Sequence, residues 1–103
     1  MTGQELYEFL GKTGFPVAYH HFNTPVSPPF IAYIRVNDDN VVADNTVYVK
    51  RDNYQVELYT DKKDTAAEKK LEDIFRENEI VYETDEIYIE TEDMYEVIYT
   101  IQV

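Results

Sequence analysis

Apolar residues recur at helical spacing near the start of the chain. Leu6, Phe9 and Leu10 share one helical face. Thr2 and Glu5 stand just ahead of them at the spacing of a capping box, in which each residue satisfies the other's backbone N–H. We therefore expect a short helix that begins after Thr2 and is stopped by the two glycines that follow Leu10.

A second helix is predicted after Asp64 or Thr65, either of which is a suitable N-cap. Its apolar residues follow the i, i+4, i+7, i+8 spacing of a buried stripe: Ala67, Leu71, Ile74 and Phe75. Asn78 is a suitable left-handed terminator. The pattern thus predicts a helix between this cap and Asn78.

The remaining segments alternate between apolar and polar residues, which is the period of a β-strand. The expected strands are 16–22, 30–36, 46–50, 54–60, 80–82, 87–90 and 94–103. In the strand 54–60, Tyr54, Val56 and Leu58 are predicted to point inward. The residues between them, Gln55, Glu57 and Tyr59, are predicted to point outward.

Polar segments predict where the strands turn. Residues 37–40 and 51–53 have the composition of turns, so we expect 46–50 and 54–60 to form a hairpin. Asp44-Asn45 marks a second polar break. A further hairpin turn is expected near residues 91–93.

The order of these elements is helix, four strands, helix, then two or three strands. It predicts an α+β fold, with a mostly antiparallel or mixed sheet and two helices packed on one face. The length of 103 residues is that of one domain, so residues 1–103 are expected to form a single unit.

Composition limits the classes of partner. The formal net charge is −12, which argues against a surface that grips nucleic acid or an anionic membrane. Cysteine is absent, so disulfides and thiolate chemistry are excluded. No basic and apolar leader is visible, and no apolar run approaches the ~18 residues of a membrane span. Ten tyrosines suit a half-exposed sheet face or a protein interface.

Candidate chemistry is weak. His20 and His21 are adjacent in a predicted strand, so we expect them on opposite faces, one packed and one exposed, and unable to bind one metal ion together. Residues 37–40 lack the glycine and spacing of a calcium loop. The carboxylates between Glu83 and Asp93 are predicted to form a solvated sheet edge. We expect no enzymatic activity, cofactor or metal.

Two long polar loops and one basic segment are the candidate interface sites. The loop residues are Pro25, Pro28 and Pro29 in segment 23–29, with Asp38, Asp39, Asp44 and Asn45 in segment 37–45. Lys62 and Lys63 lie where positive charge gathers before the second helix. These lysines are candidates for contact with an acidic patch on a neighbouring copy.

Several ordered blocks of the chain resemble tail terminator or tail-completion proteins of long-tailed phages and prophages of Gram-positive bacteria. The blocks are residues 14–22, 28–33, 43–45, 47–48, 57–64 and 94–99. They span most of the chain, although none is a catalytic signature.

The resemblance implies a ring, hexameric in the assembled tail, that caps the tail tube, ends its polymerisation and joins it to the head connector. Its partners would be further copies of itself, the tail tube protein and the head connector protein. It would lie in the virion at the head–tail junction after assembly in the host cytoplasm. DNA would pass through without being bound, which a strongly negative charge favours.

Three alternatives belong to other classes. One is a head–tail connector or head completion protein of similar size and symmetry. Another is an acidic module that mimics DNA. The last is an enzyme that uses His20 or His21 together with a carboxylate.

Overall fold

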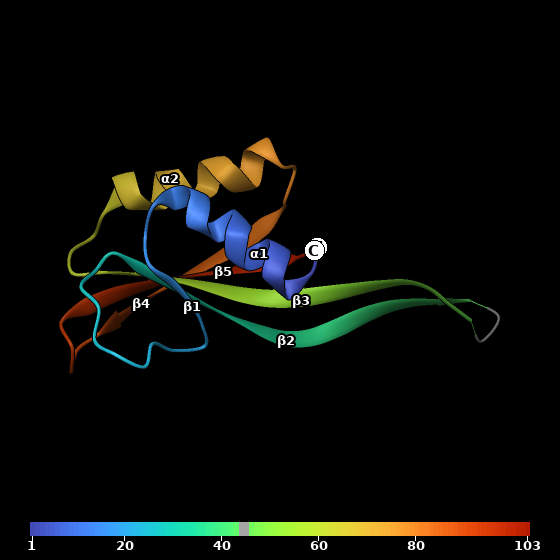
Figure 1. Cartoon of the computed structure of the whole chain (residues 1–103), viewed down its shortest axis with the longest axis horizontal. Helices are drawn as coiled ribbons and strands as arrows, with labels where there is room; N and C mark the ends of the chain where they lie inside the picture. The colour runs from blue at the N-terminus through green and yellow to red at the C-terminus, as the bar shows by residue number, and fades with distance from the viewer. Residues whose placement is uncertain (44–45) are drawn as a thin grey trace.

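Two helices cover one face of a five-stranded mixed sheet, as Figure 1 shows. This computed structural model describes residues 1–43 and 46–103, with the backbone alone described at 37–43 and 46–51. The elements are α1 (Gly3–Leu10), a 3-10 turn (Gly11–Thr13), β1 (Val17–Tyr19), β2 (Phe30–Ala43), β3 (Thr46–Thr60), α2 (Thr65–Glu77), β4 (Tyr82–Ile89) and β5 (Met94–Gln102). The predicted α+β class, with both helices on one face, is confirmed.

The sheet has the strand order β1-β2-β3-β5-β4. Its one parallel pair is β1 with β2, and the other three pairs are antiparallel. A parallel pair needs a crossover connection. Here residues 20–29 make that connection. Part of this crossover lies beside the sheet face that the helices leave uncovered, where it lines a pocket with Ala32 and Tyr59. We call this uncovered side the open face.

The helix caps follow largely from the sequence. The Thr2 side chain accepts a bond from the Glu5 N–H at 3.1 Å, and Glu5 Oε1 accepts one from the Thr2 N–H at 2.8 Å. Asp64 caps α2 by accepting from the Ala67 N–H at 3.0 Å. Asn78 follows the last helical residue, but the left-handed residue is Glu79, with φ of 57°. The prediction that Asn78 is the left-handed terminator was therefore wrong by one residue.

The core lies between the helices and the sheet. Its fully buried side chains include Leu6, Leu10, Ile31, Val56, Leu58, Leu71, Phe75 and Tyr99. Each large apolar side chain buried in this way stabilises the fold by roughly 1.5–3 kcal/mol relative to an exposed one. The predicted inward set of strand 54–60 is confirmed, because Tyr54, Val56 and Leu58 are all buried.

The turns predicted at 37–40 and 51–53 were wrong. Residues 37–40 lie within β2 and 51–53 within β3, and the two segments pair with each other in antiparallel register. The hairpin expected between 46–50 and 54–60 was wrong for the same reason, since both belong to β3. Asp and Asn favour turns locally, but here the backbone pairing of a long hairpin keeps these segments in strands. The polar break at Asp44-Asn45 lies outside the described residues.

The other strand boundaries differ in length. β1 is shorter than the predicted 16–22. β4 is one strand where two were expected, at 80–82 and 87–90, and it leaves out residues 80, 81 and 90. The turn near 91–93 is confirmed, with Asp93 at φ of 50°. No helix among the described residues has the length and hydropathy needed to cross a bilayer.

Candidate functional site

The hairpin of β2 and β3 extends beyond the rest of the sheet. β5 pairs with β3 only from Asn53 onward, and β1 pairs with β2 only at residues 31–33. We call the projecting part, residues 36–43 and 46–52, the arm. It lies along the longest axis of a molecule measuring 50 × 28 × 23 Å, and Figure 1 shows it reaching past both helices.

The base of the arm is tied to the sheet. Arg35 Nε lies 3.8 Å from Asp52 Oδ1, and the Val103 N–H donates to the Asp52 carbonyl at 3.0 Å. Two register shifts, between Arg35 and Asp38 and between Val41 and Val42, interrupt the ladder. Such bulges bend a strand and increase its twist.

Beyond this base, each strand of the arm pairs only with the other among the described residues. Both outer edges therefore leave backbone donors and acceptors unpaired by any other strand. A lone two-stranded hairpin is marginally stable in water. The arm is thus the part of the fold that has most to gain from a partner.

The predicted interface residues fall in different settings. Asp38 and Asp39 lie in the arm, in register with Asp52 and Arg51 respectively, and so belong to a strand rather than a loop. Asp44 and Asn45 lie outside the described residues. The arm therefore contains two of the four residues that the sequence singled out in segment 37–45.

The prolines belong to the connection between β1 and β2. Pro25 is exposed, whereas Pro28 and Pro29 are half-buried and joined by a cis peptide bond. Pro25 lines a pocket on the open face. The structure thus places the proline loop about that pocket and away from the arm.

One of the two lysines of the predicted basic segment is neutralised within the chain. Lys63 bonds to Glu68 at 2.8 Å and also to Glu86 on β4, which ties the start of α2 to the sheet edge. The hydrogen bonds to both carboxylates raise the pKa of Lys63. Lys62 is exposed, and no ion pair joins it to another described residue. Of the two predicted lysines, Lys62 therefore keeps its charge free for a neighbouring copy, whereas Lys63 does not.

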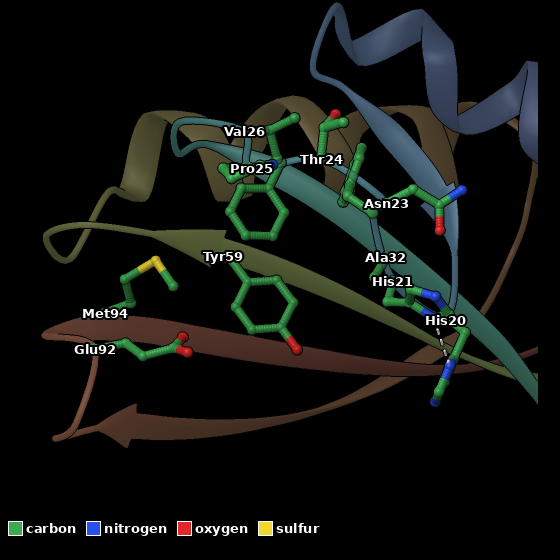
Figure 2. Close-up of a pocket in the computed structure, with 12 residues that line it drawn as sticks. His20, His21, Asn23, Thr24, Pro25, Val26, Ala32, Tyr59, Glu92 and Met94 are labelled. Atoms are coloured by element: carbon green, nitrogen blue, oxygen red, sulfur yellow. Dashed lines mark hydrogen bonds between the residues drawn. The ribbon is translucent and has the colours of Figure 1, made fainter.

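A pocket of about 630 Å³ lies on the open face, between the crossover and the sheet. Its walls include Phe22, Pro25, Phe30, Tyr59, Glu92 and Met94. Figure 2 shows Glu92 and Met94 at one end, His20 and His21 at the other, and Tyr59 between them. The pocket therefore collects side chains from the crossover, β2, β3 and the β4–β5 turn.

Stacked aromatic rings form one wall of this pocket. The centroids of Phe22 and Phe30 are 5.4 Å apart in an edge-on arrangement. Phe30 in turn stacks on Tyr59, with centroids 4.9 Å apart and planes 18° from parallel. These contacts fix the orientation of the Tyr59 ring, because offset stacking is a preferred aromatic geometry.

The hydroxyl of Tyr59 lies between two carboxylates. It lies 3.1 Å from Glu57 Oε1 and 3.0 Å from Glu96 Oε2. One hydroxyl has one proton to donate, so it satisfies one carboxylate at a time. Burial raises the pKa of the Glu57 carboxyl, and the nearby charge of Glu96 raises it further. A proton on Glu57, or a cation beside it, would therefore relieve the repulsion between the two carboxylates.

Burial also raises the pKa of the Tyr59 hydroxyl, and the two carboxylates add to the effect. Tyr59 consequently acts as a neutral donor. Glu96 is itself buried, at 9% exposure. The outward prediction for Glu57 and Tyr59 was right about the face but missed that this face is half-buried.

The two histidines differ from the sequence prediction. β1 ends at Tyr19, and His20 has a left-handed backbone with φ of 68°, so the alternation of a strand does not apply. Their Nδ1 atoms lie 3.0 Å apart, as the dashed line in Figure 2 marks, and both side chains are exposed. The prediction of opposite faces, one packed and one exposed, was wrong.

The acidic residues near the C-terminus follow the sequence prediction in part, because Glu90, Glu92 and Asp93 are exposed but lie in the turn after β4. Glu83, Asp85 and Glu86 lie on β4, an edge strand, and all three are exposed. Among the described residues, no group of three or more histidines and carboxylates is placed to hold a metal ion. The histidine pair therefore has no third ligand in the part of the chain that the structure describes.

The pocket and the acid pair, which is Glu57 and Glu96 at the Tyr59 hydroxyl, were not predicted, although a signal for the pocket exists. Phe30, Ala32 and Ile34 alternate with the buried Ile31 and Tyr33 along β2. Apolar residues on both faces of one strand indicate that both faces are partly covered. The sequence could not show that the crossover supplies the second cover.

The fold and its surfaces define a small α+β domain with a projecting hairpin and a pocket on the open side of its sheet. No protein-family model matches the chain, and no curated protein matches it.

Proposed function

We propose that this chain is a virion structural protein of the tail terminator kind. It assembles into a ring that caps the tail tube, ends tube growth and joins the tube to the head connector. The observation that carries this proposal is the arm, a hairpin whose two outer edges lack a partner strand among the described residues. The resemblance of the ordered sequence blocks to tail terminators supplies the particular role.

A closed ring requires a heterologous contact, in which one surface of a subunit meets a different surface of the next. The arm projects from one end of the sheet and provides one such surface. Its edges offer backbone N–H and C=O groups for strand addition. Five valines in the arm, Val36, Val41, Val42, Val47 and Val49, suit a strand that pairs on both sides.

The charge of the chain supports passage of DNA through such a ring. The net charge of −12 repels phosphates, whereas a lumen rich in Lys and Arg would retain them. Most of the described lysines near α2 are already engaged: Lys63 and Lys69 pair with carboxylates, and Lys70 lies over the Phe15 ring. DNA would therefore slide past the protein without being held.

Electron microscopy of phage particles made without this chain tests the proposal. A missing terminator gives tails of uncontrolled length. Finished tails of normal length beside leaking heads would contradict the proposal and favour a head completion protein instead. Supplying a chain whose arm is shortened should fail to restore tail length, whereas the wild-type chain restores it.

A further inference from the structure

We propose that the open-face pocket binds the guanidinium group of an arginine that a partner protein presents. The volume of about 630 Å³ falls within the roughly 300–1,000 Å³ that is usual for ligand pockets, and it exceeds what one side chain needs. An arginine together with an apolar neighbour would fill it. This inference stands whether or not the chain belongs to a phage particle.

The walls of the pocket suit a flat cation. Phe22, Phe30 and Tyr59 form a continuous aromatic surface through their mutual contacts. A guanidinium is planar and weakly hydrated, so it stacks on aromatic faces and is attracted by their electron-rich centres. Met94 and Val26 would contact the aliphatic part of the arginine side chain.

The charge of the pocket also selects a cation. No Lys or Arg is among the lining residues. Glu92 lines the pocket and is exposed, and its carboxylate forms no hydrogen bond or ion pair with another described residue. Glu57 and Glu96 are not among the lining residues, but both accept from the hydroxyl of Tyr59, which does line the pocket and has one proton for the two. A positive group would therefore compensate carboxylates that the chain itself leaves short of donors.

Arginine fits this arrangement better than other ligands. Glu92 would repel an anion. A neutral apolar ligand would lie against the Glu92 carboxylate without pairing with its charge. A lysine ammonium is compact and strongly hydrated, and it cannot both stack and form a bidentate bond to a carboxylate. The source is a protein segment because an open surface pocket contacts the residues on either side of an inserted side chain.

Solution NMR of the isotope-labelled full chain tests the proposal with three probes. They are N-acetyl-arginine amide, its neutral analogue N-acetyl-citrulline amide, and the peptide acetyl-Leu-Arg-Leu-amide. We expect the arginine amide to shift the backbone resonances of Phe22, Tyr59 and Met94. The citrulline amide should bind at least about tenfold more weakly, because it lacks the charge. The peptide should bind more tightly than the arginine amide.

Substitutions locate the site. Glu92→Gln should weaken binding of the arginine amide by about three- to fivefold, as expected for one exposed ion pair. Glu83→Gln, which changes an exposed carboxylate on the edge strand β4, is the matched control and should leave the affinity unchanged. Glu57→Gln should also weaken binding, because it removes one of the two carboxylates at the Tyr59 hydroxyl.

Several results would overturn the proposal. They are the absence of binding by all three probes, equal binding of the arginine and citrulline amides, and an affinity that Glu92→Gln leaves unchanged. Binding of the arginine amide but not of the peptide would overturn the assignment to a protein partner.

Discussion

The two faces of the sheet are built from the same strands but are completed differently. On the helix-covered face, α1 and α2 bury apolar side chains such as Phe75 and Leu71 completely. On the open face, a ten-residue crossover covers only one end and leaves Glu57 and Tyr59 half-buried. The covered face supplies the buried apolar core that stabilises the fold. The open face leaves polar groups half-buried, and a partner could supply the hydrogen-bond donors or positive charge that they lack.

Two tyrosines show the contrast most simply. On the covered face, the Tyr99 hydroxyl donates to Glu72 at 2.7 Å, which is one donor for one acceptor. On the open face, the Tyr59 hydroxyl lies between Glu57 and Glu96. Burial raises the pKa of both hydroxyls, so both act as neutral donors. Tyr99 therefore supplies one hydroxyl proton to one carboxylate, whereas Tyr59 has one hydroxyl proton for two carboxylates.

The largest expected effect is the loss of stability when a large aromatic residue is removed from each face of the sheet. Phe75 is fully buried and contacts the rings of Phe9, Tyr82 and Tyr99. Phe75→Ala should lower the free energy of unfolding by about 3–5 kcal/mol in urea denaturation, through lost transfer energy and a cavity. Phe30→Ala on the open face should cost about half as much, because the site is already partly wet. Equal losses would remove the contrast between the faces.

A single hydroxyl gives the next largest effect. Tyr99→Phe should lower the free energy of unfolding by about 1.5–3 kcal/mol, because a part-buried bond to a carboxylate is lost. Tyr88→Phe is the matched control, since the Tyr88 hydroxyl donates to Asp93 at 2.6 Å on an exposed hairpin. That change should cost less than about 1 kcal/mol. The paired denaturation curves would contradict the account if Tyr88→Phe proved the costlier change.

The acid pair predicts a smaller effect that depends on pH. Because folding raises the pKa of Glu57, the protonated carboxyl stabilises the native state fully below its ordinary pKa near 4.5. That contribution is lost as the pH rises through the raised value. Glu57→Gln stays neutral and keeps one hydrogen bond, so it should be more stable than wild type at pH 7 by up to about 1 kcal/mol.

Thermal unfolding from pH 4 to 8 measures this difference. The advantage of Glu57→Gln over wild type should grow with pH, while Glu83→Gln, an exposed control, should track wild type throughout. A stability difference between Glu57→Gln and wild type that stayed constant across the pH range would mean that the open face does not raise the pKa of Glu57.

The elements that the sequence predicted best are those whose signals are local. The capping pair of Thr2 and Glu5 and the apolar stripe of α2 located both helices, since each signal lies within a few turns of chain. The long strands were cut at 37–40 and 51–53 because Asp and Asn favour turns when read alone. Pairing between segments far apart in sequence decided the outcome there.

The candidate site was harder to predict because it depends on tertiary contacts. Alternation along β3 correctly put Glu57 and Tyr59 on the face opposite Val56. It could not reveal that Glu96, from β5, would meet the same hydroxyl. Nor could it show that the chain leaves β1 before His20, which turns the two histidines toward each other.

The arm differs from both faces because, beyond its base, each of its strands pairs only with the other among the described residues. A variant in which Asn-Gly replaces residues 39–51 keeps Asp52 and its contacts with Arg35 and Val103, and it closes the hairpin with a two-residue turn. We expect its stability to stay within about 1 kcal/mol of wild type, because a two-stranded hairpin adds little by itself. Near-ultraviolet circular dichroism of the tyrosines verifies that the core is intact.

Sedimentation of these two proteins tests the central claim, that the arm is the assembly element of the chain. Wild type and the arm-shortened variant are compared from about 1 µM to about 1 mM, since association depends on protomer concentration. We predict that the wild type forms a closed oligomer of one defined size and that the shortened variant remains a monomer. A wild type that stays monomeric across this range, or a shortened variant that associates equally well, would contradict the account.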